Sequence, residues 1–162
     1  MAIIAEDASR GESLVELEPS PFSTVEEAVE AIGRGEMVIV VDDPGRENEG
    51  DFVMAADLVT PEAVNFMTTH GRGIVCMPVL PERAGALGLN LLPRRGDYDG
   101  CAFTTSIDLA RMAGRGPAGV ICEIMAADGT MARLDDLVDV AALHGLHLIT
   151  IADLIAHREA RA

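Results

Sequence analysis

The chain has 162 residues, 49% of them hydrophobic, and carries 27 acidic against 12 basic side chains, a formal net charge of −15. This balance disfavours nucleic acid and membrane surfaces as partners, because phosphate binding needs a basic face. A small phosphorylated substrate needs just a local cationic pocket and stays possible. No apolar run is long enough to cross a bilayer, and the first residues lack a secretion signal, so we expect a cytoplasmic protein.

The organisation we expect is one domain behind a loose leader. Residues 1–20 are acidic without a clear period, which predicts a flexible leader. Residues 21–162 are enough for a single domain with its own core. Thr24 and Glu27 have the spacing of a capping box and predict a helix that runs to Gly33.

The remaining elements follow from turn signals and from the period of the apolar residues. We predict further helices at 60–70, 81–87, 134–143 and 151–162, strands at 37–41, 51–56, 73–79, 102–106, 120–125 and 148–151, and a long loop at 88–101. Helices and Val/Ile-rich strands alternate along the chain. This order predicts an α/β fold, a three-layer α+β sandwich in which helices cover a mixed β-sheet.

An acidic run follows the first predicted strand. Residues 42–51 contain five carboxylates around Arg46, in a turn with proline and glycine. Oxygen-rich ligands suit hard cations such as Mg²⁺, which one or two carboxylates hold together with waters and substrate oxygens. Arg46 can bind a substrate anion at the same place. The alternative is an acidic, solvated hairpin turn, since charged loops are common on sheet rims.

Glu123 interrupts the apolar strand predicted at 120–125. A carboxylate inside a sheet is costly unless it is paired, protonated or bound to a metal, and it could then transfer protons. The alternative is that Glu123 points to water, because strand alternation places Cys122 and Ile124 on one face and Glu123 on the other.

Four segments together resemble the 3,4-dihydroxy-2-butanone 4-phosphate synthase family. They occur in the family's order, at residues 41–51, 70–76, 103–108 and 117–133. The resemblance implies a homodimer that converts ribulose 5-phosphate to 3,4-dihydroxy-2-butanone 4-phosphate and formate with Mg²⁺ or Mn²⁺, for riboflavin synthesis. It further implies that Glu47 is a metal ligand and contacts the substrate, that Arg46 and Asp51 contact the sugar phosphate, and that Glu123 binds substrate and is essential for catalysis.

The chain departs from this family in one place. Family members carry a stretch with Pro-Gly-His and Gly-His-Thr-Glu-Ala motifs, the second of which supplies another metal ligand. In this chain, the segments that precede and follow that stretch in the family are joined directly, between about Ala110 and Arg111. Either the stretch is deleted, or the molecule contains residues that this sequence omits. Two functions therefore stay open: a metal-dependent lyase, or a catalytically incompetent form that binds a sugar phosphate or dimerises.

Overall fold

The computed structural model describes residues 20–43, 45, 46, 48–89 and 104–161, and it is built on a five-stranded sheet in the order β3-β4-β2-β1-β5. Strands β1 and β5 run parallel, and the other neighbouring pairs run antiparallel. The strands are β1 (Val38–Val41), β2 (Gly50–Ala55), β3 (Arg72–Cys76), β4 (Gly119–Ile124) and β5 (His147–Thr150). The prediction of a mixed sheet is confirmed, and β1 and β2 form an antiparallel pair on either side of the acidic run.

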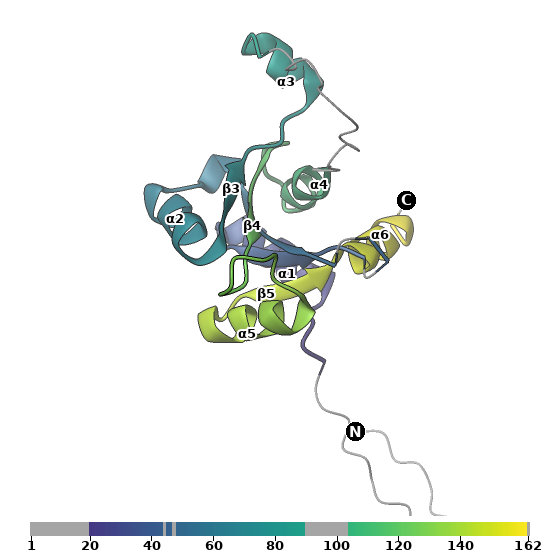
Figure 1. The fold of residues 1–162 in the computed structure, drawn as a ribbon. Coiled ribbons are helices and arrows are strands. Elements are labelled where there is room, and N and C mark those ends of the chain that lie inside the picture. The colour runs from purple at the N-terminus through teal and green to yellow at the C-terminus, as the bar shows by residue number, and fades with distance from the viewer. Residues whose placement is uncertain (1–19, 44, 47, 90–103, 162) are drawn as a thin grey trace, which may run out of the picture.

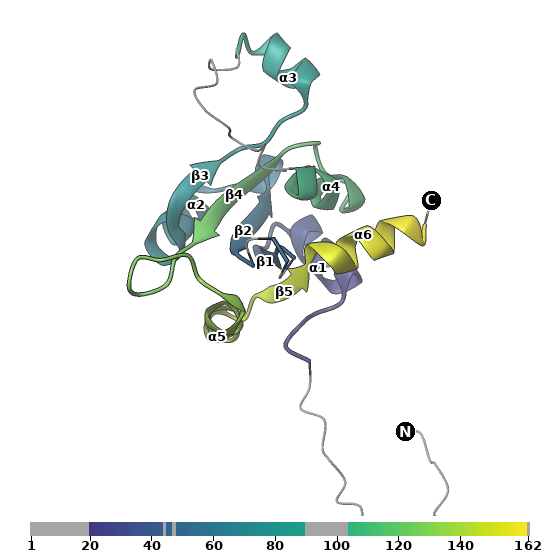
Figure 2. The same ribbon diagram turned by 45° about the vertical axis from the view of Figure 1, so that its right-hand side comes forward.

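Helices cover both faces of this sheet, so the molecule has the three layers that we predicted (Figure 1). The helices are α1 (Val25–Arg34), α2 (Pro61–Phe66), α3 (Pro81–Ala86), α4 (Thr104–Met112), α5 (Leu134–His144) and α6 (Ile151–Glu159), with short turns η1 (Ala56–Leu58) and η2 (Met67–Gly71). One apolar cluster joins α1, α4 and α6 to the sheet, and a second joins η2 and α5 to the opposite face. Figure 2 shows α1, α4 and α6 together on one side of the strands and α5 on the other.

Helix α1 begins as its sequence predicts. The Thr24 hydroxyl accepts a hydrogen bond from the Glu27 amide at 3.2 Å, and the Glu27 carboxylate accepts one from the Thr24 amide at 2.8 Å. The helix ends at Gly35, whose φ of 82° places it in the left-handed region where glycine is favoured. Between these ends, Ala28, Ala31 and Ile32 are fully buried against the sheet.

The predicted strand at 102–106 is wrong where the structure describes it. Residues 104–106 begin helix α4, and residues 102 and 103 lie outside the described part of the chain. The local sequence Thr-Thr-Ser-Ile has strand propensity, but propensity is a weak determinant beside burial. Ser106, Leu109 and Ala110 have the spacing of one helical face and are all buried, so tertiary packing favours the helix.

Element boundaries differ from the predictions elsewhere by a few residues. The helix predicted at 60–70 ends its α-helical part at Phe66 and continues as the π-helical turn η2. Strand β3 ends at Cys76, and Val79 pairs with Ala118 through an isolated bridge. The predicted leader 1–20, except for Ser20, and the predicted loop 88–101, except for Gly88 and Leu89, lie outside the described residues.

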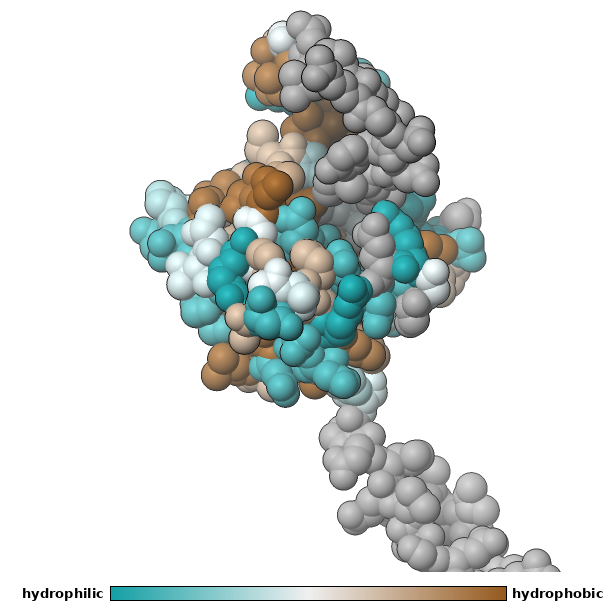
Figure 3. Space-filling view, in the orientation of Figure 1, coloured by the Kyte–Doolittle hydropathy of each residue, from teal (hydrophilic) through white to brown (hydrophobic). Residues whose placement is uncertain are grey.

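Helix α3 projects from the body of the molecule beyond the end of β3 (Figure 1). The segment that leads to it and follows it exposes apolar side chains, including Met77, Leu87 and Leu89. In the space-filling view, brown hydrophobic atoms occupy part of this projecting region, beside white and teal ones (Figure 3). In the part of the chain that the structure describes, no helix has the length and apolarity needed to cross a membrane.

Candidate active site

Two carboxylates that lie 72 residues apart in sequence face each other across neighbouring strands. Asp51 on β2 is the direct register partner of Glu123 on β4. Strand alternation turns both side chains to the face that carries α1, α4 and α6, together with Val53 and Ile121. The Cβ atoms of such a pair lie about 4.5–5.5 Å apart, and two like charges there repel each other. This pair therefore favours a cation beside the two carboxylates.

The acidic loop joins the end of β1 to the start of β2, and it brings further polar groups close to Asp51 and Glu123. The Asp42 carboxylate accepts a hydrogen bond from the Glu49 amide at 3.1 Å, and the Asp42 amide donates to the Glu49 carbonyl at 3.0 Å. Arg46 lies 3.8 Å from the Asp42 carboxylate. Asn48 has a φ of 52°, a left-handed conformation that asparagine tolerates better than most residues. The loop is thus folded tightly back onto the start of β2.

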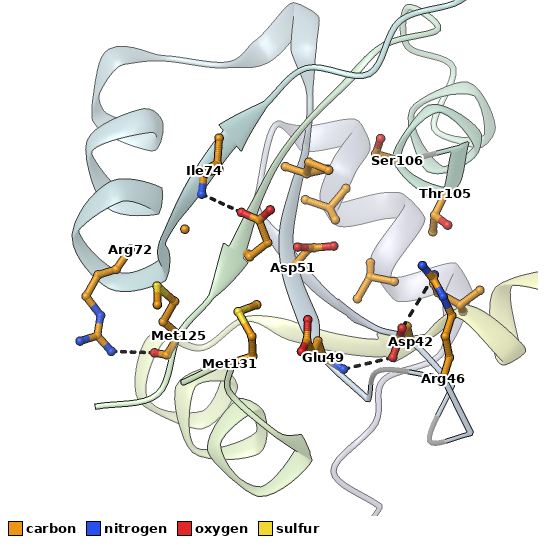
Figure 4. Close-up of a pocket in the computed structure, with 16 residues that line it drawn as sticks. Asp42, Arg46, Glu49, Asp51, Arg72, Ile74, Thr105, Ser106, Met125 and Met131 are labelled. Atoms are coloured by element: carbon orange, nitrogen blue, oxygen red, sulfur yellow. Dashed lines mark hydrogen bonds and ion pairs between the residues drawn. The ribbon is translucent and has the colours of Figure 1, made fainter. Parts of the chain in front are cut away.

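These groups line a cavity of about 450 Å³, a volume typical of small-molecule sites. Its floor is the apolar face of the sheet, and the first turns of α4 and α6 form one wall. Figure 4 shows Asp51 inside the cavity, with Arg46 beside Asp42 at its edge. The lining residues are Val40, Asp42, Arg46, Glu49, Asp51, Val53, Arg72, Gly73, Ile74, Thr105, Ser106, Ile121, Glu123, Met125, Met131 and Ile151.

The charge of the described cavity wall is negative. Four carboxylates line it, against the two arginines Arg46 and Arg72. The Arg72 guanidinium donates hydrogen bonds to the carbonyl oxygens of Met125 and Ala126 at 2.6 and 2.7 Å, so it is engaged with backbone (Figure 4). Arg46 belongs to the acidic loop itself, and its side chain lines the cavity, where an anionic group of a ligand can reach it.

The donor atoms suit a hard cation but do not form a complete cage. The carboxylate oxygens of Asp51 and Glu123 have the chemistry that Mg²⁺ prefers. Within the described part of the chain, no three His, Cys, Asp or Glu side chains come together in an arrangement that could hold a metal. The described residues thus fit a cation held by one or two carboxylates with waters and substrate oxygens, and they do not fit a cation held by protein ligands alone.

Three of the four predicted site residues come together in this cavity. Arg46, Asp51 and Glu123 all line it, whereas Glu47 lies outside the described residues. Of the two readings of Glu123, an outward-pointing side chain in water and a site residue, the geometry favours the second. Sequence reasoning missed Gly73, Ile74 and the start of α4. The glycine pair at residues 71 and 73 was the available signal, because it indicates a close approach of backbone.

The observations define an α/β protein with a small-molecule cavity over one face of its sheet, in which two opposed carboxylates lie. A family model described as 3,4-dihydroxy-2-butanone 4-phosphate synthase matches the chain at residues 26–110 and again at 104–157. Together these matches cover most of the sequence. The chain belongs to the 3,4-dihydroxy-2-butanone 4-phosphate synthase family.

Curated relatives share over a third of their aligned residues with this chain. The riboflavin biosynthesis protein RibBA of Aquifex aeolicus is 42% identical over 205 residues, which cover 88% of this chain and 50% of the relative. The 3,4-dihydroxy-2-butanone 4-phosphate synthase of Pseudomonas aeruginosa is 38% identical over 197 residues, covering 85% of this chain and 54% of the relative. The chain thus spans about half the length of the curated relatives it matches.

Solved structures agree with the fold. RibBX, a two-domain 3,4-dihydroxy-2-butanone 4-phosphate synthase from A. baumannii, matches with a TM-score of 0.77 and 36% identity, over 84% of this chain and 58% of that one. A 3,4-dihydroxy-2-butanone 4-phosphate synthase in complex with two magnesium ions matches with a TM-score of 0.76 and 27% identity, over 86% of this chain and 98% of that one.

The alignments with the curated relatives are longer than the number of residues that this chain contributes to them. With Aquifex aeolicus RibBA the alignment spans 205 residues, whereas 88% of 162 residues is about 143. The two matches to the family model also overlap at residues 104–110, in helix α4.

Proposed function

We propose that this chain carries the ribulose 5-phosphate site of riboflavin synthesis and acts in the conversion of that sugar phosphate to 3,4-dihydroxy-2-butanone 4-phosphate and formate. The observation that carries the proposal is the opposed pair Asp51 and Glu123 in one cavity with Arg46, in a member of this family. The two products together contain every atom of the substrate, so neither water nor an oxidant is consumed. Proton movements are what the side chains must supply.

Each residue has a role that its surroundings support. Arg46, at the edge of the cavity, contacts the phosphate or a hydroxyl of the sugar, and Asp51 accepts hydrogen bonds from sugar hydroxyls on the floor. Glu123 faces the same space, contacts substrate, and moves protons on and off its carbon and oxygen atoms. The apolar floor excludes water from the reacting atoms and strengthens these charged contacts.

Glu47 is our proposed metal ligand, with Mg²⁺ or Mn²⁺ as the cation. A divalent cation, when bound, supplies Lewis-acid polarisation of the sugar's oxygen atoms. Glu47 belongs to the same acidic loop as Asp42 and Glu49, both of which line the cavity. We propose further that the protein works as a homodimer, which light scattering coupled to gel filtration tests by giving twice the mass of one chain.

A second candidate function is binding of the sugar phosphate without turnover. Two observations favour it: the alignment with Aquifex aeolicus RibBA spans roughly 60 more residues than this chain contributes, and the family model matches residues 104–110 twice. Both observations are expected if a family segment is deleted between about Ala110 and Arg111. In addition, the described residues do not form a complete cage of protein ligands for a metal. The intact mass of the purified chain tests whether the deletion is real.

One experiment separates the two candidates. Formate release from ribulose 5-phosphate is measured with Mg²⁺, with Mn²⁺ and with EDTA, alongside calorimetric binding of the same sugar. Cation-dependent formate that disappears in Glu47→Ala and in Glu123→Ala supports the lyase, with Glu30→Ala on the exposed face of α1 as the matched control. Binding without formate supports the second candidate, and absence of both contradicts the proposal.

A further inference from the structure

We propose that the bulge formed by Arg72, Gly73 and Ile74 at the start of β3 is a positioning device for the Glu123 carboxylate. The consequence of this inference for catalysis rests on the proposed function, whereas the geometry of the bulge does not depend on it. Three independent features of the bulge converge on this one side chain.

The first feature is a break in strand register. Arg72 pairs with Ile124 and Val75 pairs with Cys122, so Gly73 and Ile74 together stand opposite Glu123. Two residues against one is the pattern of a β-bulge, which releases a backbone group from the ladder and bends the strand. The released group is the Ile74 amide, which donates a hydrogen bond of 2.6 Å to Glu123 Oε2 (Figure 4). A hydrogen bond to a carboxylate is stronger than one between two neutral groups.

The second feature is the absence of a side chain at residue 73. A Cβ atom there would lie 2.5 Å from the Glu123 carbonyl oxygen, 2.6 Å from Oε2 and 2.8 Å from its Cβ atom. Separations below 3.0 Å force the neighbouring atoms to move. Glycine is therefore required by space, and the backbone of β3 can approach Glu123 closely enough to bind its carboxylate.

The third feature is the anchoring of the bulge by Arg72. Its φ of 63° is left-handed, a conformation that costs free energy for a residue with a side chain. Its guanidinium donates to the carbonyls of Met125 and Ala126, and the Met125 amide donates to the Gly71 carbonyl at 2.9 Å. The segment before the bulge is thus tied to the segment that directly follows Glu123, which fixes the two strands relative to each other.

Packing does not explain this arrangement. β3 is an edge strand of the sheet, and the Ile74 side chain is 71% exposed. The bulge therefore contributes little to the core at residue 74, while its amide points to a carboxylate that faces the cavity. By holding one oxygen of Glu123, the bulge sets the direction from which the carboxylate meets a bound substrate.

Nuclear magnetic resonance on the full chain tests the geometry without any substrate. The Ile74 amide proton is expected downfield and protected from solvent exchange, and Glu123→Ala is expected to move it upfield and remove the protection. Gly73→Ala should have the same effect on Ile74 while the amides of α1 keep their protection. Gly85→Ala, at a glycine with open space around its Cβ position, is the control. An Ile74 amide that behaves alike in all four proteins would overturn the proposal.

Ligand affinity tests the consequence. We expect Gly73→Ala to weaken binding of ribulose 5-phosphate roughly tenfold, the effect of losing one hydrogen bond to a charged group, and Gly85→Ala to leave it unchanged. If the unaltered chain releases formate, kcat should fall further than KM rises. Equal affinity in Gly73→Ala and Gly85→Ala contradicts the positioning role. Failure of the unaltered chain to bind the sugar counts against the proposed function instead, and the resonance result still decides the geometry.

Discussion

At the residue scale, we expect the directly opposed carboxylates of Asp51 and Glu123 to cost stability. Directly opposed like charges in an antiparallel pair destabilise it by some tenths of a kcal/mol up to about 1 kcal/mol. We therefore predict that Asp51→Asn raises the free energy of unfolding in urea by roughly 0.2–1 kcal/mol in the absence of cations, while affinity for ribulose 5-phosphate falls. Asp57→Asn, at an exposed position outside the cavity, is the control. A less stable Asp51→Asn would contradict this account of the pair.

His144 gives the molecule a pH dependence at a different place. Its ring lies 4.5 Å from that of His70 and 4.9 Å from that of Phe66, measured between centroids. Burial lowers the pKa of His144, and the neighbouring charge of His70 lowers it further. Arg72, Asp136 and Asp139 line the same hollow. A histidine whose pKa is lowered in the folded state binds a proton more readily after unfolding. It therefore favours unfolding once the pH falls below the ordinary pKa of histidine.

We predict from this that the unfolding temperature falls as the pH is lowered from 7.5 to 5.5, and that the fall is smaller in His144→Gln. The window lies below about 6.5, the ordinary pKa of histidine. Hydrogen bonds lower the pKa values of Glu27, Glu36 and Asp128, so these carboxylates titrate well below the window and do not confuse the comparison. Parallel slopes in the two proteins, measured by differential scanning calorimetry, would show that His144 does not contribute.

The proximity of two site residues could be worked out from the residue pattern only where they are close in the chain. Arg46 and Asp51 share the acidic run, so their common location follows from one turn. Glu123 could be recognised as unusual inside an apolar strand, but its partner could not. The β2–β4 register depends on which strands pair, and pairing of segments so far apart is set by the whole core.

At the scale of the element, the capping box of α1 offers a local test of stability. Thr24→Ala removes the hydroxyl that accepts from the Glu27 amide, and we expect it to lower the free energy of unfolding by about 1 kcal/mol. Thr24→Ser keeps the hydroxyl and should lose less than half of that. Urea denaturation followed by circular dichroism measures both variants. Equal losses in the two would mean that the threonine methyl group, and not the cap, supports the helix.

The elements whose type was predicted correctly have strong local signals. Capping at Thr24, proline at the start of α2 and glycine after α5 all mark helix ends by local chemistry. The predicted end of α1 at Gly33 lies inside the helix, which ends at Gly35 instead. Helix α4 lacked such a signal, and its β-branched first residues favoured a strand. Its helical state depends on burying Leu109 and Ala110 against α1 and the sheet, which is information that a local pattern does not contain.

At the scale of the whole molecule, α4 is the place where the proposed deletion would have joined two parts of the family fold. Ile107, Leu109 and Ala110 are buried, and the Asp108 carboxylate binds Arg158 of α6 at 2.5 Å. The junction therefore lies inside a helix that packs on the core and bonds to its neighbour. We infer that the chain folds with the segment absent, because the helix supplies both the apolar face and the polar contact that this position needs.

This inference leads to a gain-of-function prediction. Insertion between Ala110 and Arg111 of the roughly 60 residues that the alignment with Aquifex aeolicus RibBA leaves unmatched should raise cation-dependent formate release at least tenfold. A flexible Gly/Ser insert of equal length is the control, because it restores length without ligands. Equal activity of the two inserted chains and the unaltered chain would argue that nothing essential is missing.

The central claim is that the cavity around Asp51 and Glu123 binds ribulose 5-phosphate, and resonance mapping with the isotopically labelled chain tests it most directly. With Mg²⁺ present, addition of the sugar phosphate should shift the amide resonances of Asp51, Ile74 and Glu123 in a saturable way, and Glu123→Gln should weaken the binding. Resonances on the far face of the sheet, such as those of α5, should stay in place. Saturable shifts confined to another surface, or no shifts at millimolar sugar, would contradict the account.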